Sequence, residues 1–162
     1  MEKMSRWGVG PWLTIITGTY GAIMMAVDFI FNPVFRITFI SSPILWIVGV
    51  FLIVVGLLML SISARALHRA YNNDKLCTTG VYAFCRNPIY SSWILFILPG
   101  IALCFRSWTL LTAPLAMYIS FKFFVREEEE YMTEIFGDDY LEYKSEVNSI
   151  FPLPPLKKHS PQ

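Results

Sequence analysis

The chain has 162 residues, of which 55% are hydrophobic, 16% aromatic and only 15% charged. Soluble domains carry about 25% charged residues, so this composition is typical of a protein that lies largely in a membrane. A net charge of +1 argues against a nucleic-acid partner, which would need a clear basic excess. Two histidines, and three cysteines without C-x-x-C spacing, give no pattern for a metal site or a disulfide framework.

Four apolar runs follow one another along the chain, over residues 11–31, 43–64, 89–105 and 108–125. A helix needs about 20 residues to cross the hydrocarbon core, with about 17 as the lower limit, and the third run is near that limit. Lipid offers backbone groups no hydrogen-bond partners, so such runs must be helical. The first run is too long for a signal peptide and no small-x-small cleavage site follows it. We therefore predict an all-α integral membrane bundle of about four transmembrane helices.

Basic residues predict the orientation of this bundle. Lys3 and Arg6 lie at the amino end, and further lysines and arginines concentrate in the connection at 65–87 and in the tail from residue 126. The first and third connections have one arginine each. Since cytoplasmic connections carry the excess of lysine and arginine, we expect the amino end, the central connection and the tail to face the cytoplasm.

The third connection contains only Arg106 and Ser107, so the third and fourth runs must form an antiparallel hairpin. This hairpin would bring Pro88, at the start of the third run, beside Arg126, at the end of the fourth. The two polar stretches that flank the hairpin are therefore expected to converge on one site at the membrane surface.

Three parts of the chain follow from this organisation. Residues 1–125 form the transmembrane bundle, which includes the cytoplasmic connection at 65–87. Residues 126–152 form a cytoplasmic helical tail that completes the site. Residues 153–162 are rich in proline and are expected to be disordered.

The stretch at 80–90, Gly-Val-Tyr-Ala-Phe-Cys-Arg-Asn-Pro-Ile-Tyr, leads directly into the third run. Asn87 suits the N-cap of that helix and Pro88 suits its first position. On one interpretation the pair marks only a helix start. On the other, free N–H groups near Ile89 and Tyr90 form a hydrogen-bond or anion site. Tyr90 is also consistent with an aromatic anchor at the membrane interface.

Arg126 and four glutamates at 127–130 follow the last apolar run. The acidic run is consistent with a solvated helical turn, and only one or two of its side chains can point at the bundle. An apolar stripe at 131–136 then leads to Gly137, which is typical of a helix end. A second helix with its own apolar stripe is predicted beyond Gly137.

Asp28 lies inside the first apolar run. An ionisable residue within a span is a functional candidate by default. Asp28 is also only three residues from Phe31, so it is equally placed to reach the far membrane interface.

Three stretches carry a family resemblance. They are Leu76-Cys77-Thr78-Thr79-Gly80-Val81-Tyr82, then Arg86-Asn87-Pro88-Ile89-Tyr90, and, after a glutamate pair, Phe136-Gly137-Asp138-Asp139-Tyr140-Leu141-Glu142-Tyr143-Lys144. In this order they resemble the isoprenylcysteine carboxyl methyltransferase family, which is related to the membrane phospholipid N-methyltransferases. The resemblance covers about residues 60–152. It implies a helical membrane enzyme that binds S-adenosylmethionine between the central connection, the start of the third helix and the tail.

The resemblance also implies roles for individual residues. Arg126 would lie near the transferring methyl group and could orient an anionic acceptor. The chemistry of the residues themselves suggests that Arg126 or Arg86 would hold a carboxylate acceptor, whereas an amine acceptor would need a general base. Glu128 is the matching glutamate by its distance from Phe136 and Gly137. The implied cofactor contacts are Lys75, Leu76, Cys77, Tyr82, Asn87, Pro88, Ile89, Tyr90 and Glu128.

Two departures from the family pattern bear on the substrate. Asn87 stands where the carboxyl methyltransferases usually have histidine, whereas the phospholipid enzymes look more like Asn-Pro-x-Tyr. Phe124, rather than Arg126, aligns with the substrate-side arginine of eukaryotic members, and an arginine at 126 is closer to the bacterial ones. Both departures leave the implied cofactor site intact.

We therefore expect a membrane methyltransferase that uses S-adenosylmethionine, yields S-adenosylhomocysteine and acts on a lipophilic or lipidated acceptor from the bilayer. Carboxyl methylation of a prenylcysteine-like substrate is favoured over N-methylation of phosphatidylethanolamine. The protein's task in either reaction is to align the reactants and exclude water, and no metal is required. The alternative is a non-catalytic membrane binding or scaffold protein on the same fold, which Asn87 keeps open.

Overall fold

The computed structural model describes residues 10–31 and 34–154, and every regular element in these ranges is a helix. The long helices are α1 (Gly10–Ile30), α2 (Ser42–Asn72) and α5 (Ala113–Glu146). The predicted all-α fold is confirmed. Residues 155–162, which belong to the end that was expected to be disordered, lie outside the described residues. The shorter elements are η1 (Gly80–Ala83), α3 (Pro88–Ser91), η2 (Ser92–Ile97), α4 (Leu98–Phe105) and η3 (Leu110–Thr112).

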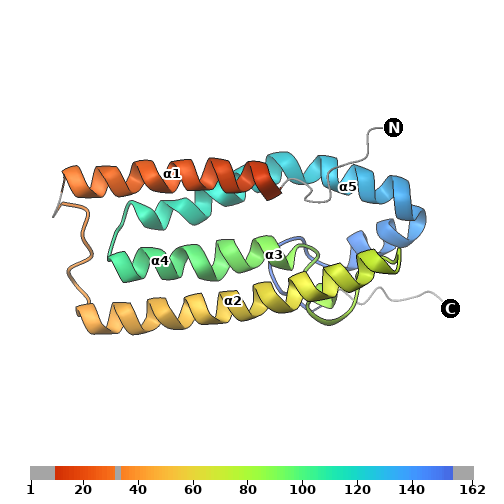
Figure 1. Ribbon diagram of the computed structural model, residues 1–162, viewed down its shortest axis with the longest axis horizontal. Coiled ribbons are helices and arrows are strands. Elements are labelled where there is room, and N and C mark those ends of the chain that lie inside the picture. Colours follow the sequence, from red (N-terminus) through yellow and green to blue (C-terminus); the bar gives the residue numbers. More distant parts are fainter. Residues whose placement is uncertain (1–9, 32–33, 155–162) are drawn as a thin grey trace.

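The long helices run along a common direction, with α3 and α4 between α1 and α2 (Figure 1). Within the described residues, three helices are long and apolar enough to cross a membrane, namely α1, α2 and the continuous helix from Pro88 to Phe105. Their outward faces carry large apolar side chains, such as Trp12 and Phe51, each with an exposed fraction of 63%. Faces of this kind suit lipid chains rather than water. The chain is therefore an integral membrane protein.

The fourth apolar run becomes helical later than expected, so its apolar helical part is short. The chain turns at Arg106 and Ser107, passes through η3, and enters α5 only at Ala113. The apolar part of α5, which ends at Val125, is shorter than the three other spans, although it lies along α1 (Figure 1). About four spans were expected. The described residues form three spans of full length and one shorter apolar helical segment.

The helix from Pro88 to Phe105 contains the π-helical turn η2. Pro99 follows this turn, and a proline inside an α-helix lacks an N–H and clashes with the carbonyl four residues earlier, here that of Leu95. The wider π turn accommodates the proline ring without ending the helix. The helix thereby continues over the 18 residues from Pro88 to Phe105, which is long enough for a short span.

The predicted hairpin between α4 and α5 is confirmed, and it is pinned to the connection that follows α1. Arg106 adopts a left-handed backbone conformation with φ 57°. The Ile37 N–H donates to the Arg106 carbonyl at 2.7 Å, and the Trp108 N–H donates to the Phe35 carbonyl at 3.0 Å. These bonds join two connections at the same end of the bundle, away from the start of α3 (Figure 1).

Glycines allow α2 and α4 to pack at close range. A Cβ atom at Gly49 would lie 2.7 Å from the Gly100 carbonyl oxygen, and a Cβ atom at Gly100 would lie 2.7 Å from the Gly49 carbonyl oxygen. Carbonyl oxygens of two helix backbones cannot move aside as a flexible side chain does. A side chain at either position would therefore force the helices apart.

Gly100→Ala is expected to lower the free energy of unfolding by about 1–3 kcal/mol, because the added methyl group overpacks this contact. Gly18→Ala is the matched control, since a Cβ atom there meets nothing within 4 Å. The control should be neutral or stabilise the protein by up to about 1 kcal/mol. Unfolding of the purified protein in detergent measures both variants. Equal effects at the two positions would contradict the close contact between α2 and α4.

Gly137 breaks α5, with φ 55° and ψ −130°, a conformation that glycine adopts at little cost. The predicted helix end at this position is confirmed, and the chain turns here so that the rest of the tail returns toward the start of α3 (Figure 1). A small apolar cluster holds the returning part against the first part of α5. Its members are Tyr140, Tyr143 and Val147, packed with Leu76, Met132 and Phe136.

Candidate active site

The start of the third span and the acidic part of α5 meet at one end of the bundle. The Tyr90 hydroxyl donates to Glu128 Oε2 at 3.3 Å, across 38 positions of sequence. Arg86 Nη1 lies 3.0 Å from Glu129 Oε1. The two polar stretches predicted to converge are thus in direct contact, and the hairpin between α4 and α5 positions them.

The four consecutive glutamates divide into two pairs. Glu128 and Glu129 are partly buried and make the contacts with the start of the third span, whereas Glu127 and Glu130 are exposed. The expectation that at most two of them face the bundle is confirmed. Arg126 is exposed on α5, two positions before Glu128.

The environment of Glu128 disfavours the ionised form of its carboxyl group. Burial raises the pKa of its carboxyl group above the ordinary value, and the neighbouring Glu129 adds to that rise. The hydrogen bond from Tyr90 lowers the Glu128 pKa and offsets part of the effect. A carboxylate held in this way is stabilised by any cation or hydroxyl group that a ligand brings to it.

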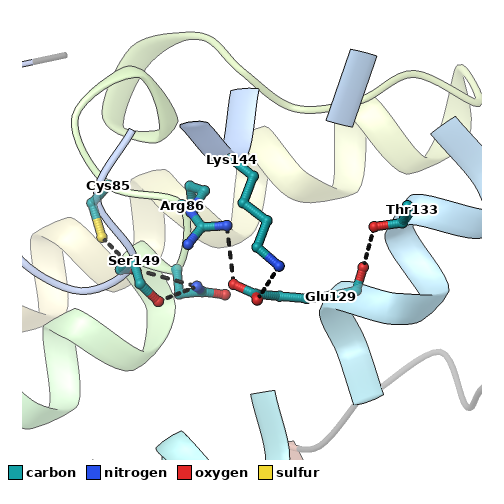
Figure 2. A network of polar contacts seen from close by, with 7 residues as sticks. Cys85, Arg86, Glu129, Thr133, Lys144 and Ser149 are labelled. Atoms are coloured by element: carbon teal, nitrogen blue, oxygen red, sulfur yellow. Dashed lines mark hydrogen bonds and ion pairs between the residues drawn. The ribbon is translucent and has the colours of Figure 1, made fainter. Parts of the chain in front are cut away.

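Glu129 forms the centre of an ion-pair network. Figure 2 shows Arg86 and Lys144 pointing at its carboxylate, with distances of 3.0 Å from Arg86 Nη1 and 2.8 Å from Lys144 Nζ. The Arg86 and Glu129 side chains are only 10% and 14% exposed. Burial raises the pKa of Tyr140 to about 12, with Glu129 adding to the shift and Arg86 opposing it. Arg86, which was predicted to hold an acceptor, is therefore already engaged by a carboxylate of the protein.

Asn87 is the N-cap residue of the helix that follows it, as predicted, but the predicted side-chain cap bond is not formed. Its Nδ2 instead donates to Ser149, with distances of 3.3 Å to the carbonyl oxygen and 3.2 Å to Oγ. The backbone N–H groups of Arg86 and Asn87 donate to the carbonyls of Asn148 and Ser149 at 2.9 and 3.1 Å. Pro88 does occupy the first helical position, as predicted. Asn87 thus holds residues 148–150, the return segment, against the start of α3.

Two residues that were not predicted complete this attachment. Cys85 is fully buried, and its Sγ lies 3.0 Å from Ser91 Oγ and 3.2 Å from the Ile150 carbonyl oxygen. The Ser91 hydroxyl donates to the same carbonyl at 2.5 Å. Their partners on the return segment are backbone atoms, which leave no pattern in the sequence.

Other residues of the predicted cofactor set lie beside the tail. The Tyr143 hydroxyl donates to the Tyr82 backbone carbonyl at 2.6 Å. Burial raises the pKa of Tyr82, and the negative charge of Glu128 adds to that rise. Burial also raises the pKa of the Cys77 thiol. Lys75, by contrast, is exposed.

An apolar cavity of about 380 Å³ reaches this site from within the bundle. It lies between α1 and the helices that follow Pro88, and Gly18 and Gly21 of α1 leave the space open. Ile89 and Tyr90 line it together with Gly10 at the first residue of α1. The cavity therefore connects the hydrocarbon-facing part of the bundle to the residue that contacts Glu128. A mostly apolar space of this size with a few polar groups is typical of a small-molecule site.

This arrangement of an apolar cavity and a polar site can be compared with known proteins. The sequence profile of the phospholipid methyltransferase family matches residues 37–139, which is more than half of the chain. The chain belongs to this family.

Within the phospholipid methyltransferase family, the chain resembles enzymes named protein-S-isoprenylcysteine O-methyltransferase. Identity is 32% over 82 residues for the Xenopus laevis protein, 33% over 85 for that of Schizosaccharomyces pombe and 34% over 79 for that of Mus musculus. These matches cover 51%, 52% and 48% of this chain, but only 28%, 36% and 28% of the relatives. The aligned segment thus spans about a third of the length of the curated relatives. No solved structure matches the chain.

Proposed function

We propose that this chain is an S-adenosylmethionine-dependent methyltransferase that acts on a lipophilic acceptor. The observation that carries the proposal is the contact between Tyr90 and the partly buried Glu128, beside an apolar cavity. A poorly solvated anion next to such a space suits a site where a charged, soluble donor meets a lipid-like acceptor. Membership of the phospholipid methyltransferase family supports the same class of reaction.

The residues around Glu128 fit the chemistry of the donor. One Glu128 oxygen accepts the bond from Tyr90, and the other is proposed to accept bonds from the donor's ammonium or ribose hydroxyl groups. Because the Asn87 side chain does not cap the helix, the first N–H groups near Ile89 are free of a side-chain cap and suit a carboxylate. When bound, S-adenosylmethionine supplies a sulfonium methyl group that is transferred in line to the acceptor.

The other proposed donor contacts surround this carboxylate. Tyr82 and Tyr90 are proposed to contact the adenosine, since both are aromatic, the Tyr90 hydroxyl bonds to Glu128 and the Tyr82 carbonyl bonds to Tyr143 of the tail. The set is completed by Lys75, Leu76, Cys77 and Asn87 of the central connection and by Pro88 at the start of α3. The excess of basic residues around this end of the bundle supports a cytoplasmic orientation, so the donor is proposed to enter from the cytoplasm.

The acceptor is proposed to be a carboxylate attached to a prenyl-like chain. The apolar cavity suits the chain, and the exposed Arg126 lies close in sequence to Glu128 and suits the carboxylate. We assign this role to Arg126 because Arg86 would have to leave Glu129 first. An anionic acceptor and a cationic donor lose charge as they react, so exclusion of water favours the transfer.

Two other functions have specific support. N-methylation of phosphatidylethanolamine is favoured by the family name and by Asn87 in place of histidine, but it would need a general base near the acceptor. A non-catalytic binding protein is the other candidate, because Asn87 makes structural contacts with Ser149. The names of the curated relatives support carboxyl methylation of a prenylcysteine-like acceptor as the first choice.

Calorimetric titration of the detergent-purified protein with S-adenosylmethionine and S-adenosylhomocysteine tests the proposal. We expect saturable binding of both, followed by methyl transfer to a farnesylated cysteine analogue rather than to phosphatidylethanolamine. Transfer to the phospholipid alone would reassign the acceptor. Folded protein that binds neither compound would favour the non-catalytic alternative.

Arg126→Ala is expected to lower kcat for the carboxylate acceptor by roughly 10- to 100-fold, because a positive charge near the reacting group is lost. Donor affinity should stay within about twofold, since the side chain is proposed to hold the acceptor only. Arg65→Ala, at an exposed position on α2, is the matched control. An unchanged kcat in the Arg126 variant would remove this residue from the site.

A further inference from the structure

A second cavity lies at the end of the bundle opposite Glu128, and it combines charged and apolar walls. Its volume is about 290 Å³, and its walls come from the end of α1, the connection before α2 and the turn after α4 (Figure 1). Asp28, Arg36 and Arg106 provide the charges. Met25, Phe29 and Phe105 are among its apolar residues. Met25 and Leu110 also line the apolar cavity proposed for the acceptor chain, whereas the three charged residues line this cavity and not that one.

Asp28 is fixed in this cavity with acceptor capacity left over. The Thr109 hydroxyl donates to Asp28 Oδ1 at 2.6 Å. The second carboxylate oxygen, Oδ2, has no hydrogen-bond donor among the described residues. A carboxylate within a membrane helix is expensive unless it is paired, so this oxygen favours a cationic or hydrogen-bond-donating ligand.

The two arginines present positive charge to the same cavity. Arg106 Nη1 and Nη2 donate to Ser42 Oγ at 3.1 Å and to the Ile37 carbonyl at 3.0 Å, which fixes the guanidinium. Its Nε is buried and has no partner within residues 10–31 and 34–154. Arg36 is exposed at the rim, and its side chain has no ion-pair partner in the described part of the chain.

From this geometry we infer that the cavity binds the headgroup of a zwitterionic phospholipid. The phosphate lies between Arg36 and Arg106, where guanidinium groups provide charge-assisted hydrogen bonds. The ammonium group pairs with Asp28, and the apolar wall contacts the first methylene groups of the acyl chains. Two positive charges and one negative charge match a headgroup that carries both signs. An anionic lipid without an ammonium group leaves Asp28 unpaired.

The charged groups of this site are distinct from those of the proposed methyl-transfer site, because Asp28, Arg36 and Arg106 lie at the end of the bundle opposite Glu128. It anchors α1 to the turn after α4 through one lipid molecule. The occupant is a bound structural lipid of the opposite leaflet and not a methyl acceptor.

Thermal unfolding of the full chain in detergent, titrated with short-chain phosphatidylethanolamine, phosphatidylglycerol or free phosphoethanolamine, tests the inference. We expect the ethanolamine lipid to raise the unfolding midpoint saturably, at a half-saturating concentration about tenfold below that of the glycerol lipid. Asp28→Asn, which keeps an acceptor for Thr109, should abolish this preference. Arg36→Gln should weaken the binding of both lipids by about tenfold. Glu128→Gln should leave the binding of both lipids unchanged.

Arg69→Gln, at an exposed position near the other end of α2, is the matched control and should bind both lipids as the unsubstituted chain does. Equal affinity for the two lipids would overturn the pairing with Asp28. Free phosphoethanolamine that binds as tightly as the lipid would overturn the lipid assignment. If Asp28→Asn does not fold, unchanged binding in the Arg36 variant overturns the proposal by itself.

Discussion

Glu128→Gln is expected to weaken S-adenosylmethionine binding by roughly 10- to 100-fold. This is the effect of losing one hydrogen bond to a charged group, because such a bond contributes about 1.5–3 kcal/mol to binding. Glutamine keeps the size of the side chain and an oxygen that accepts the bond from Tyr90, so the change removes mainly the negative charge. Glu127→Gln, on the exposed side of the same turn, is the matched control. Calorimetry on both variants measures the difference, and equal affinities would exclude Glu128 from the donor site.

The pH dependence separates a binding role from a structural role of Glu128. Burial raises the pKa of Glu128, so its contribution to stability is greatest at acid pH and is lost as the pH rises through the native pKa. Glu128→Gln should therefore not lower the unfolding midpoint at neutral pH. The cationic donor favours the ionised carboxylate, so its affinity should fall as the pH drops through the raised pKa. This fall should be absent in the glutamine variant, and a parallel fall in both proteins would contradict the assignment.

Glu129→Ala is expected to lower the free energy of unfolding by about 3–5 kcal/mol, because it leaves the nearly buried Arg86 cation without its partner. The tail should loosen as well, since Glu129 also pairs with Lys144 beyond the break in α5. Hydrogen exchange of residues 138–150 measures the loosening, and denaturation in detergent measures the stability.

Two further variants define this effect. Glu130→Ala, at an exposed neighbouring position, should change the free energy of unfolding by less than about 0.5 kcal/mol. The double variant Arg86→Met with Glu129→Met should recover most of the lost stability, because an apolar pair of similar size often replaces a buried ion pair without cost. A double variant as unstable as Glu129→Ala would mean that shape, and not the unpaired charge, causes the loss.

The features that the sequence predicted well are those with local causes. The hairpin followed from the two-residue connection at Arg106 and Ser107, and it alone required the two polar stretches to meet. Helical geometry limited the glutamates that face the bundle to two, and the structure selects Glu128 and Glu129. Gly137 was identifiable because a left-handed conformation at a helix end favours glycine.

The features that the sequence did not predict depend on tertiary partners. Asn87 has the local preference of a helix cap, but Ser149, 62 positions away, competes successfully for its amide. Arg86 was assigned to an acceptor because nothing local indicated its pairing with Glu129. The late start of α5, by contrast, has a local cause that the apolar pattern concealed. Ser107 Oγ accepts the Leu110 N–H at 2.9 Å in a turn inside a run that reads as continuously apolar.

The return segment has a consequence for the timing of synthesis. Arg86 and Asn87 are held by Asn148 and Ser149 through backbone bonds of 2.9 and 3.1 Å, so the proposed donor site is complete only when the last part of the described chain has been made. All three full-length spans precede this point in the sequence. A growing chain can therefore enter the membrane with its site still open. We therefore expect a chain that is cut short before residue 148 to enter the membrane without binding the proposed methyl donor.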